Sequence, residues 1–139
     1  MKVITKSPRE TEKVGERLGK RLKIGDIVLV MGELGAGKSV FVKGVAKGLG
    51  VKEMVKSPSF IIIRRMDGIY PFYHIDLYRV EPHEIEELGI FELADNGVVC
   101  VEWGDRILPL LKDKRKIVVR IIKIDGNSRK IEIDDTSLN

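Results

Sequence analysis

The sequence predicts an α/β fold in which helices flank a mixed central sheet with antiparallel hairpins attached, and three features support it. A short apolar strand at residues 27–31 runs directly into a glycine-rich loop and then a helix. Residues 98–101 form a continuous apolar run, which is typical of a strand buried on both faces. The pair Asp67-Gly68 separates two strand-like segments and indicates a hairpin. We therefore expect parallel strands at the centre and antiparallel pairs attached to them.

One helix is expected before the strand at residues 27–31 in the sequence, and a second helix after it. Ser7 and Glu10 form a capping box, and Pro8 occupies the first helical position, so a helix should begin there and run to about Leu22. Its apolar positions recur at helical spacing: Val14, Leu18 and Leu22. The second helix follows the glycine-rich loop, and Gly50 is expected to close it.

The second half of the chain predicts shorter elements. Strands are expected around residues 60–63 and 72–78, followed by a short acidic helix from Pro82 to about residue 89. Asn96-Gly97 turns the chain into the apolar run at 98–101. A short helix or loop should span 106–111, and a second hairpin should pair 116–124 with 130–133. We see no linker or repeat, so residues 1–139 are expected to form a single domain.

Composition limits the classes of function. The chain has no apolar run long enough for a membrane span and no apolar N-terminal leader. Cys100 is the only cysteine, and its apolar neighbours predict a buried thiol in a reducing setting, so we expect a cytoplasmic protein. The net charge of +4 permits contact with nucleic acid or an acidic partner without requiring it, because the basic residues are scattered.

The glycine-rich loop carries the strongest chemical signal. Its sequence, Gly32-Glu33-Leu34-Gly35-Ala36-Gly37-Lys38-Ser39, matches the phosphate-binding P-loop pattern G-x-x-x-x-G-K-[ST]. The glycines let backbone N–H groups converge on phosphate oxygens at a helix N-terminus. Lys38 is expected to reach the outer phosphates and Ser39 to bind magnesium. The alternative, a chance glycine turn before a helix, explains less of this order, and we expect a P-loop NTPase fold.

Two acidic residues could serve the metal and the attacking water. Glu102 directly follows the buried run, where a carboxylate is costly unless it meets a cation or a donor. Asp76 shares one face of its predicted strand with His74 and Tyr78, which suits a magnesium environment. The alternatives are a solvated carboxylate at a strand end for Glu102 and a hydrogen-bonded surface face for Asp76.

Two further features have both a functional and a structural interpretation. The segment Ser57-Pro58-Ser59-Phe60 could be a switch loop whose hydroxyls sense the outer phosphate, or a turn that begins a strand. Trp103, the only tryptophan, adjoins Glu102, and a core or interface anchor is the default role for such a residue.

These motifs together resemble one family. The P-loop, then Ser57-Pro58-Ser59-Phe60, then His74-Ile75-Asp76-Leu77-Tyr78-Arg79, then Glu102-Trp103 occur in the order and spacing of TsaE (YjeE), the small P-loop ATPase of bacterial tRNA threonylcarbamoyladenosine synthesis. The likeness covers the chain from the first helix to Trp103. The combination of motifs is far more specific than the P-loop alone, which many families share. Ser39 and Ser59 stand where the family often has threonine, and both keep the hydroxyl.

The resemblance implies a set of site residues. ATP would contact Thr11 near the adenine, the loop residues Glu33, Leu34, Gly35, Ala36, Gly37, Lys38 and Ser39, and Trp103 beside the site. Magnesium would involve Ser39, Asp76 and Glu102, and the last two would join Lys38 in catalysis. Residues 57–60 would be the nucleotide-responsive switch. A surface threonine on a helix explains Thr11 equally well.

The resemblance also implies a function. The protein would bind and hydrolyse ATP, slowly by itself, and support TsaD and TsaB as they transfer a threonylcarbamoyl group to the adenosine beside the tRNA anticodon. Contact with tRNA would be indirect, through that complex. Three alternatives remain: a small P-loop kinase, a GTPase and a nucleotide-gated binding module. A kinase is disfavoured because 139 residues leave little room for a lid and an acceptor pocket, and a GTPase because no N-K-x-D segment is present.

Overall fold

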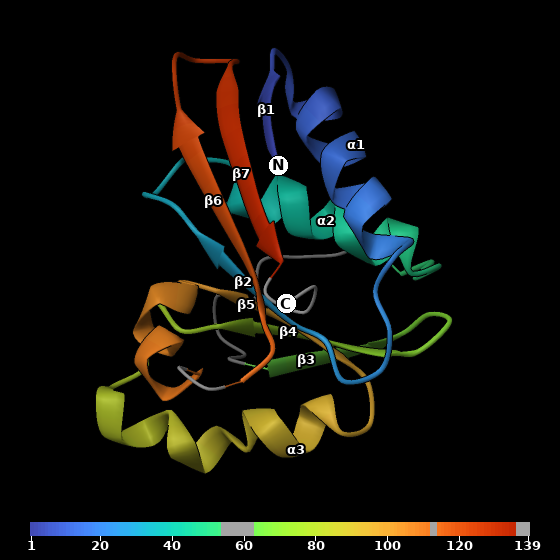
Figure 1. Cartoon of the computed structure of the whole chain (residues 1–139), viewed down its shortest axis with the longest axis vertical. Coiled ribbons are helices and arrows are strands. Elements are labelled where there is room, and N and C mark those ends of the chain that lie inside the picture. The colour runs from blue at the N-terminus through green and yellow to red at the C-terminus, as the bar shows by residue number, and fades with distance from the viewer. Residues whose placement is uncertain (54–62, 112–113, 136–139) are drawn as a thin grey trace.

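In the computed structural model of the chain, the residues described are 1–53, 63–111 and 114–135. Within these ranges seven strands form one sheet in the order β1-β7-β6-β2-β5-β4-β3 (Figure 1). The strands are β1 (Lys2–Thr5), β2 (Ile27–Met31), β3 (Ile63–Asp67), β4 (Pro71–Asp76), β5 (Val98–Glu102), β6 (Ile117–Lys123) and β7 (Arg129–Asp135). The α/β fold with a mixed sheet is confirmed.

The centre of the sheet is parallel and its margins are antiparallel, as predicted. β2 pairs in parallel with β5 on one side and β6 on the other, and β4 pairs in parallel with β5. The antiparallel pairs are β3 with β4, β6 with β7, and β1 with β7. All five residues of β2 and all five of β5 are buried, because helices or 3-10 turns cover both faces of the central strands.

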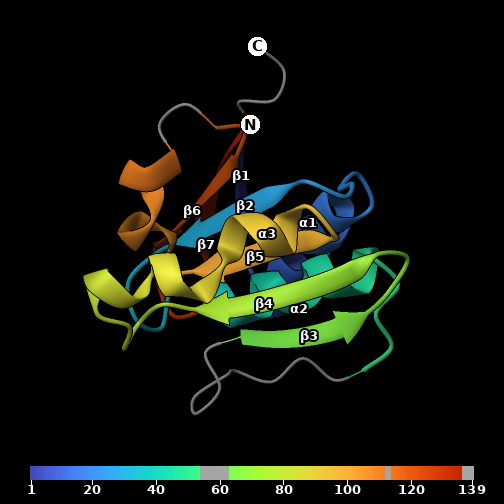
Figure 2. The same cartoon turned by 90° about the horizontal axis from the view of Figure 1, so that it is seen from below.

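The two long helices lie on one face of the sheet and the shorter helical segments on the other (Figures 1 and 2). α1 (Pro8–Gly19) and α2 (Lys38–Gly48) pack with Val28 and Val30 of β2 in one apolar cluster. α3 (Ile90–Ala94) and four 3-10 segments cover the opposite face, where Leu29 of β2 is buried. The 3-10 segments are η1 (Pro82–Glu84), η2 (Glu86–Leu88), η3 (Gly104–Arg106) and η4 (Leu108–Leu111).

α1 and α2 touch backbone to backbone. A Cβ atom added at Gly15 would collide with the Phe41 carbonyl oxygen, and one at Gly44 would collide with the Glu12 carbonyl oxygen. Glycine is therefore required at this crossing, since any side chain would force the helices apart. The capping box of α1 is present in part: Ser7 Oγ accepts from Glu10 N at 3.2 Å, while Glu10 Oε1 accepts from Lys6 N at 2.8 Å.

Several predicted element limits were wrong. The first helix ends at Gly19 rather than at Leu22, because the backbone turns there with Arg21 N donating to Leu18 O at 2.9 Å. Leu22 still packs into the core from that turn. The predicted acidic helix has its expected limits, from Pro82 to Gly89, but it consists of two 3-10 turns rather than an α-helix, and Gly89 ends the second turn with φ 66°. The strand β1 and the helix α3 were not predicted. Of the strand predicted at residues 60–63, residues 60–62 lie outside the described residues.

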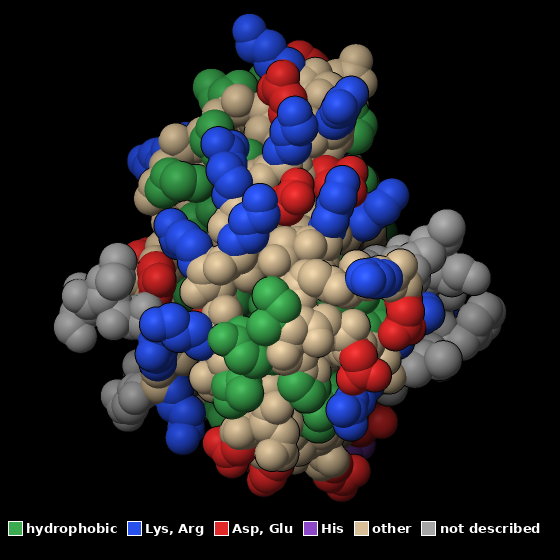
Figure 3. All heavy atoms as spheres, turned by 90° about the vertical axis from the view of Figure 1, so that its right-hand side faces the viewer, with side chains coloured by type: hydrophobic (Ala, Val, Ile, Leu, Met, Phe, Trp, Pro, Cys, Tyr) green, Lys and Arg blue, Asp and Glu red, His purple; other side chains and the backbone are tan. Residues whose placement is uncertain are grey.

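The burial of Cys100 was predicted correctly. Its side chain is fully enclosed, and desolvation raises the pKa of the thiol well above its usual range. None of the helices in the described part of the chain has the length and apolarity needed to cross a membrane. On the face shown in Figure 3 Lys and Arg side chains are most frequent in the upper part, with acidic side chains between them, and α1 contributes exposed Arg9, Lys13 and Arg17.

Candidate functional site

The candidate site lies where three parallel strands end side by side. In the sheet register Val30 of β2 is opposite Glu102 of β5, and Glu102 is opposite Asp76 of β4. β2 then continues into the glycine-rich loop, which leads into α2. Ligands of open α/β sheets bind at the carboxyl ends of the parallel strands. The topology therefore brings both predicted carboxylates to the edge from which the loop rises.

The loop has the backbone shape that glycine permits. Gly35 and Gly37 have φ angles of 78° and 101°, in the left-handed region that other residues rarely adopt. Gly32 lies against β6, since a Cβ there would be 2.7 Å from the Ile121 carbonyl oxygen. Gly37 is the N-cap of α2 and makes no side-chain capping hydrogen bond, so the anion-favouring start of the helix has no side-chain cap.

Lys38 folds back over the loop. Its Nζ donates to Gly32 O at 2.6 Å and to Glu33 O at 2.8 Å, and it lies 4.3 Å from the centre of the Trp103 ring. The residue is only 6% exposed. Desolvation lowers the pKa of the Lys38 ammonium, and the charge of Glu102 partly opposes this shift. The ammonium is thus held by carbonyls and an aromatic face beside the phosphate loop.

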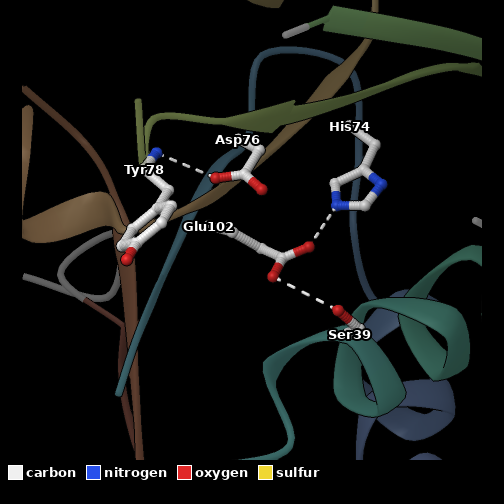
Figure 4. A network of polar contacts seen from close by, with 5 residues as sticks. All are labelled: Ser39, His74, Asp76, Tyr78 and Glu102. Carbon is white, nitrogen blue, oxygen red and sulfur yellow. Dashed lines mark hydrogen bonds and ion pairs between the residues drawn. The ribbon is translucent and has the colours of Figure 1, made fainter. Parts of the chain in front are cut away.

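Glu102 connects the loop helix to β4 (Figure 4). Its Oε2 lies 2.5 Å from Nε2 of His74, and its Oε1 accepts from Ser39 Oγ at 3.4 Å. The side chains of His74 and Glu102 are 0% and 5% exposed. His74 Nδ1 is buried and has no hydrogen-bond partner among the described residues. The carboxylate is therefore fixed between an imidazole and the hydroxyl that was predicted to bind magnesium.

Asp76 lies in the next strand and is half-buried. Its Oδ1 accepts from Tyr78 N at 2.9 Å, and its other carboxylate oxygen points away from that contact (Figure 4). Burial raises the pKa of Asp76, and the Tyr78 N–H and the Lys38 charge act in the opposite direction. The prediction that Tyr78 shares the strand face was wrong, because β4 ends at Asp76 and Tyr78 is exposed.

Trp103 has an unusual backbone conformation directly after Glu102. Its φ of 61° makes it the one non-glycine residue of the described chain in the left-handed region. Gly104 follows so close to β2 that a Cβ would be 2.6 Å from the Leu29 Cβ. The ring of Tyr78 packs on the Trp103 ring with centres 4.9 Å apart. The forced turn lays the indole over Lys38, and such strain is characteristic of functional sites.

The remaining predicted residues fall into three groups. Glu33 and Leu34 are exposed at the tip of the loop, whereas Ala36 is buried beneath it. Thr11 is 2% exposed and its Oγ1 lies 2.7 Å from Thr5 Oγ1, so it is not a surface threonine. It lines a small hollow of about 50 Å³ beside Gly37, away from the carboxylates. The predicted switch, Ser57 to Phe60, lies outside the described residues.

Two features of the site were not found from the sequence. His74 was expected only as a member of a polar strand face, and its direct contact with Glu102 depends on pairing between β4 and β5. Arg129 of β7 was not considered, yet its Nε donates to Ala36 O in the loop at 2.6 Å. No local pattern could have identified a contact between residues so far apart in sequence.

The donor set suits a nucleotide with magnesium. The uncapped start of α2 and the left-handed glycines form a concave backbone for phosphate oxygens. The oxygen atoms of Ser39, Glu102 and Asp76 are of the type that magnesium prefers. In the described part of the chain no cluster of three or more His, Cys, Asp or Glu side chains forms a ready metal cage.

The strand, glycine-rich loop, helix and flanking parallel strands define this chain as a P-loop protein. The solved structures include a close likeness: the crystal structure of Bacillus subtilis YdiB matches 97% of this chain and 84% of its own, with a TM-score of 0.82 and 33% identity.

The chain belongs to the TsaE family. Residues 5–131 match the family described as threonylcarbamoyl adenosine biosynthesis protein TsaE. Two relatives named tRNA threonylcarbamoyladenosine biosynthesis protein TsaE illustrate the likeness. The Bacillus subtilis relative is 42% identical over 83% of this chain and 73% of its own. The Treponema pallidum relative is 34% identical over 91% of this chain and 96% of its own. The family therefore links the chain to tRNA threonylcarbamoyladenosine biosynthesis.

Proposed function

We propose that this protein is a magnesium-dependent ATPase of the cytoplasm that serves the enzymes forming threonylcarbamoyladenosine in tRNA. The observation that carries the proposal is the position of the Glu102 carboxylate, which accepts from the Ser39 hydroxyl at the start of α2, directly after the Lys38 ammonium. Phosphate-binding backbone, a cation, a hydroxyl and a fixed carboxylate are the components that hydrolysis of a nucleoside triphosphate requires.

Lys38 has a defined task in this proposal. Its ammonium now rests on the Gly32 and Glu33 carbonyls, and it would turn to the outer phosphates when these arrive. Charge that develops on the phosphoryl oxygens would then be spread over a cation in a partly dry environment, where the attraction is stronger than in water. Trp103 would keep water away from the ammonium on its other side.

The two carboxylates would divide the work. Ser39 and Asp76 would hold magnesium with its waters, and Glu102 would contact the same environment through Oε1 while His74 fixes Oε2. Magnesium, when bound, would neutralise charge on the phosphates. Glu102 would orient the attacking water by accepting one of its hydrogen bonds. The assignment of water to Glu102 and metal to Asp76 follows from Glu102 being the more fixed of the two.

The nucleotide end of the site is proposed to extend toward Thr11. The hollow that Thr11 lines with Gly37, Val40 and Arg129 lies beside the start of α2, and in this proposal a base or ribose that follows the phosphates would enter it. Thr11 Oγ1 already has Thr5 as a partner, so its contribution would be to shape the hollow rather than to bind strongly.

The proposed partners are TsaD and TsaB, with tRNA contacted through them. Among the described residues the hydrogen-bond partners of the Glu102 carboxylate are Ser39 and His74, and Arg129 is bound to carbonyls of the loop. We therefore expect slow turnover by the isolated protein and a change in rate when the partners bind.

The test is an ATPase assay of the purified protein, alone and with TsaD and TsaB, together with an assay of tRNA modification. Glu102→Ala should keep ATP binding and complex formation while hydrolysis and repeated modification stop. Modification at the full rate by that variant would refute the ATPase proposal and favour a nucleotide-gated binding module. Transfer of phosphate to an acceptor other than water would indicate a kinase, and equal competition by GTP would argue against preference for ATP.

A further inference from the structure

Arg129 connects two parts of the molecule that are distant in sequence. It begins β7, at the end of the hairpin formed by β6 and β7, and its guanidinium reaches the phosphate loop. Nε donates to Ala36 O at 2.6 Å and Nη2 donates to Gly35 O at 3.2 Å. Nη1 donates to Asp125 O at 2.7 Å and to Ser128 O at 2.9 Å, both in the hairpin turn. One side chain thus joins the turn to the loop.

The hairpin turn that supports Arg129 is itself ordered by hydrogen bonds. Asp125 Oδ1 accepts from Asn127 N at 2.9 Å and from Ser128 N at 2.8 Å. These bonds hold the Asp125 and Ser128 carbonyls toward the guanidinium. The planar guanidinium has donors in fixed directions and can donate to four carbonyls at once, whereas the N–H donors of a lysine ammonium all lie on a single nitrogen. The contact is therefore specific to arginine.

The two loop carbonyls matter because of peptide geometry. In a trans peptide the C=O and the following N–H point in opposite directions. The Gly35 and Ala36 carbonyls face Arg129, so the N–H groups of Ala36 and Gly37 face the other way. Ala36 N is used within the loop, donating to Glu33 O at 3.0 Å. Gly37 N–H is on the side of the loop opposite to the guanidinium, next to the Lys38 and Ser39 amides at the start of α2.

We propose that Arg129 is a positioning residue that orients the peptide planes of the phosphate loop from behind. The inference rests on the proposed function, since it assumes that these amides receive phosphate. By holding Gly35 O and Ala36 O, Arg129 restricts a loop whose glycines at 35 and 37 would otherwise allow many backbone conformations. Its permanent positive charge also lies directly behind the amides, where it adds to their attraction for an anion.

The test uses the intact chain with Arg129→Ala, Arg129→Lys and a matched control, Lys130→Ala. Lys130 is the next residue of β7 and pairs with Glu132 at 3.3 Å, away from the loop. The first measurement is hydrogen exchange of the Ala36 amide without nucleotide, because its N–H donates to Glu33 O and belongs to the peptide whose carbonyl Arg129 holds. The second is calorimetric affinity for ATP and for inorganic tripolyphosphate. Exchange of Val119 in β6 reports whether the hairpin remains intact.

We expect both Arg129 variants to exchange the Ala36 amide about tenfold faster or more, with Val119 unchanged. Affinity for ATP and for tripolyphosphate should fall about tenfold in Arg129→Ala, and by less in Arg129→Lys, which keeps the positive charge. Lys130→Ala should match the wild type. If Arg129→Ala does not fold, Arg129→Lys retains the stem and the charge and is expected to show the same faster exchange of the Ala36 amide.

Exchange at the wild-type rate in the loop of the Arg129 variants would overturn the positioning role, whatever their affinity. A wild-type protein that binds neither ATP nor tripolyphosphate would instead refute the proposed function. Faster loop exchange in Arg129→Ala would still support the positioning role in that case, so the two failures are distinguishable.

Discussion

His74 and Glu102 face each other inside the protein, with Nε2 of the imidazole 2.5 Å from Oε2 of the carboxylate. The contact exists because β4 and β5 are parallel neighbours and both side chains project toward α2. Since a carboxylate oxygen accepts, Nε2 of the ring is the donor in this contact. The imidazole thus leaves Oε1 as the carboxylate oxygen that faces Ser39.

Loss of His74 should therefore affect the chemical step more than nucleotide binding. In His74→Ala the buried Glu102 loses a partner, and we expect unfolding free energy to fall by about 1–3 kcal/mol. We also expect kcat for ATP to fall with KM little changed, because the phosphate loop is untouched. His74→Gln keeps a donor and should retain more activity. Equal kcat in His74→Ala and wild type would show that the pair is structural only.

The ionised carboxylate of Asp76 should lower the free energy of unfolding at neutral pH, relative to an uncharged side chain at this position. Its pKa is raised in the folded protein, so the folded state holds the proton more tightly than the unfolded chain. Stability is then lost as pH rises from about 4, the ordinary value of an aspartate, through the folded pKa. Asp76→Asn keeps the acceptor for Tyr78 N and removes this loss, so it should raise the melting temperature at pH 7 but not near pH 3.

The same variant should bind magnesium poorly, which provides a check on function. Thermal stabilisation by magnesium with ATP should be smaller in Asp76→Asn than in the wild type. A variant that is destabilised at pH 7, or that responds to magnesium as the wild type does, would contradict the assignment.

Trp103 should report the position of Lys38. It is the only tryptophan, and the Lys38 ammonium lies 4.3 Å from its ring centre. When phosphates attract Lys38, the environment of the indole changes, so we expect its fluorescence to shift on addition of ATP and magnesium. Lys38→Met should show neither the shift nor ATP binding. An unchanged emission spectrum in a wild-type protein that binds ATP by calorimetry would mean that Lys38 stays on the ring.

Gly32 should not tolerate a methyl group. The Cβ of Gly32→Ala would lie 2.7 Å from the Ile121 carbonyl oxygen and 3.1 Å from the Ala36 Cβ, so the loop must shift. We expect a loss of about 1–3 kcal/mol in unfolding free energy and weaker ATP binding. Gly126→Ala, in the hairpin turn with nothing within 4 Å of the added atom, is the control and should be neutral in both assays.

Local pattern predicted much of the fold and part of the site. The run of β2, the loop and α2 was predictable because glycine spacing and apolar periodicity act over a few residues. The parallel centre followed from the apolar run at Val98 to Val101. The end of α1 at Gly19 was not predictable, because tertiary packing rather than helix propensity ends that helix. The limits of the acidic segment at 82–89 were predictable, but its division into two 3-10 turns was not.

Within the site, the individual residues were predictable from local sequence, whereas the contacts between them were not. Ser39 and Glu102 were each predicted from their own surroundings, and the parallel strands bring them together. The His74 contact and the Arg129 contact depend on which strands are neighbours and on the path of a distant hairpin. Such contacts appear only when the sheet order is known.

The crossing of α1 and α2 has a mechanical consequence. At Gly15 and Gly44 the helices meet through main-chain atoms, with no layer of side chains that could deform between them. If α2 rotates slightly when an anion binds at its first turn, α1 would therefore have to move with it, because no side chains between the two helices can absorb the displacement. The exposed arginine and lysine side chains along α1 would then change position when nucleotide binds or is released. The basic surface of α1 would thus differ between the two states, although it lies apart from the phosphate loop.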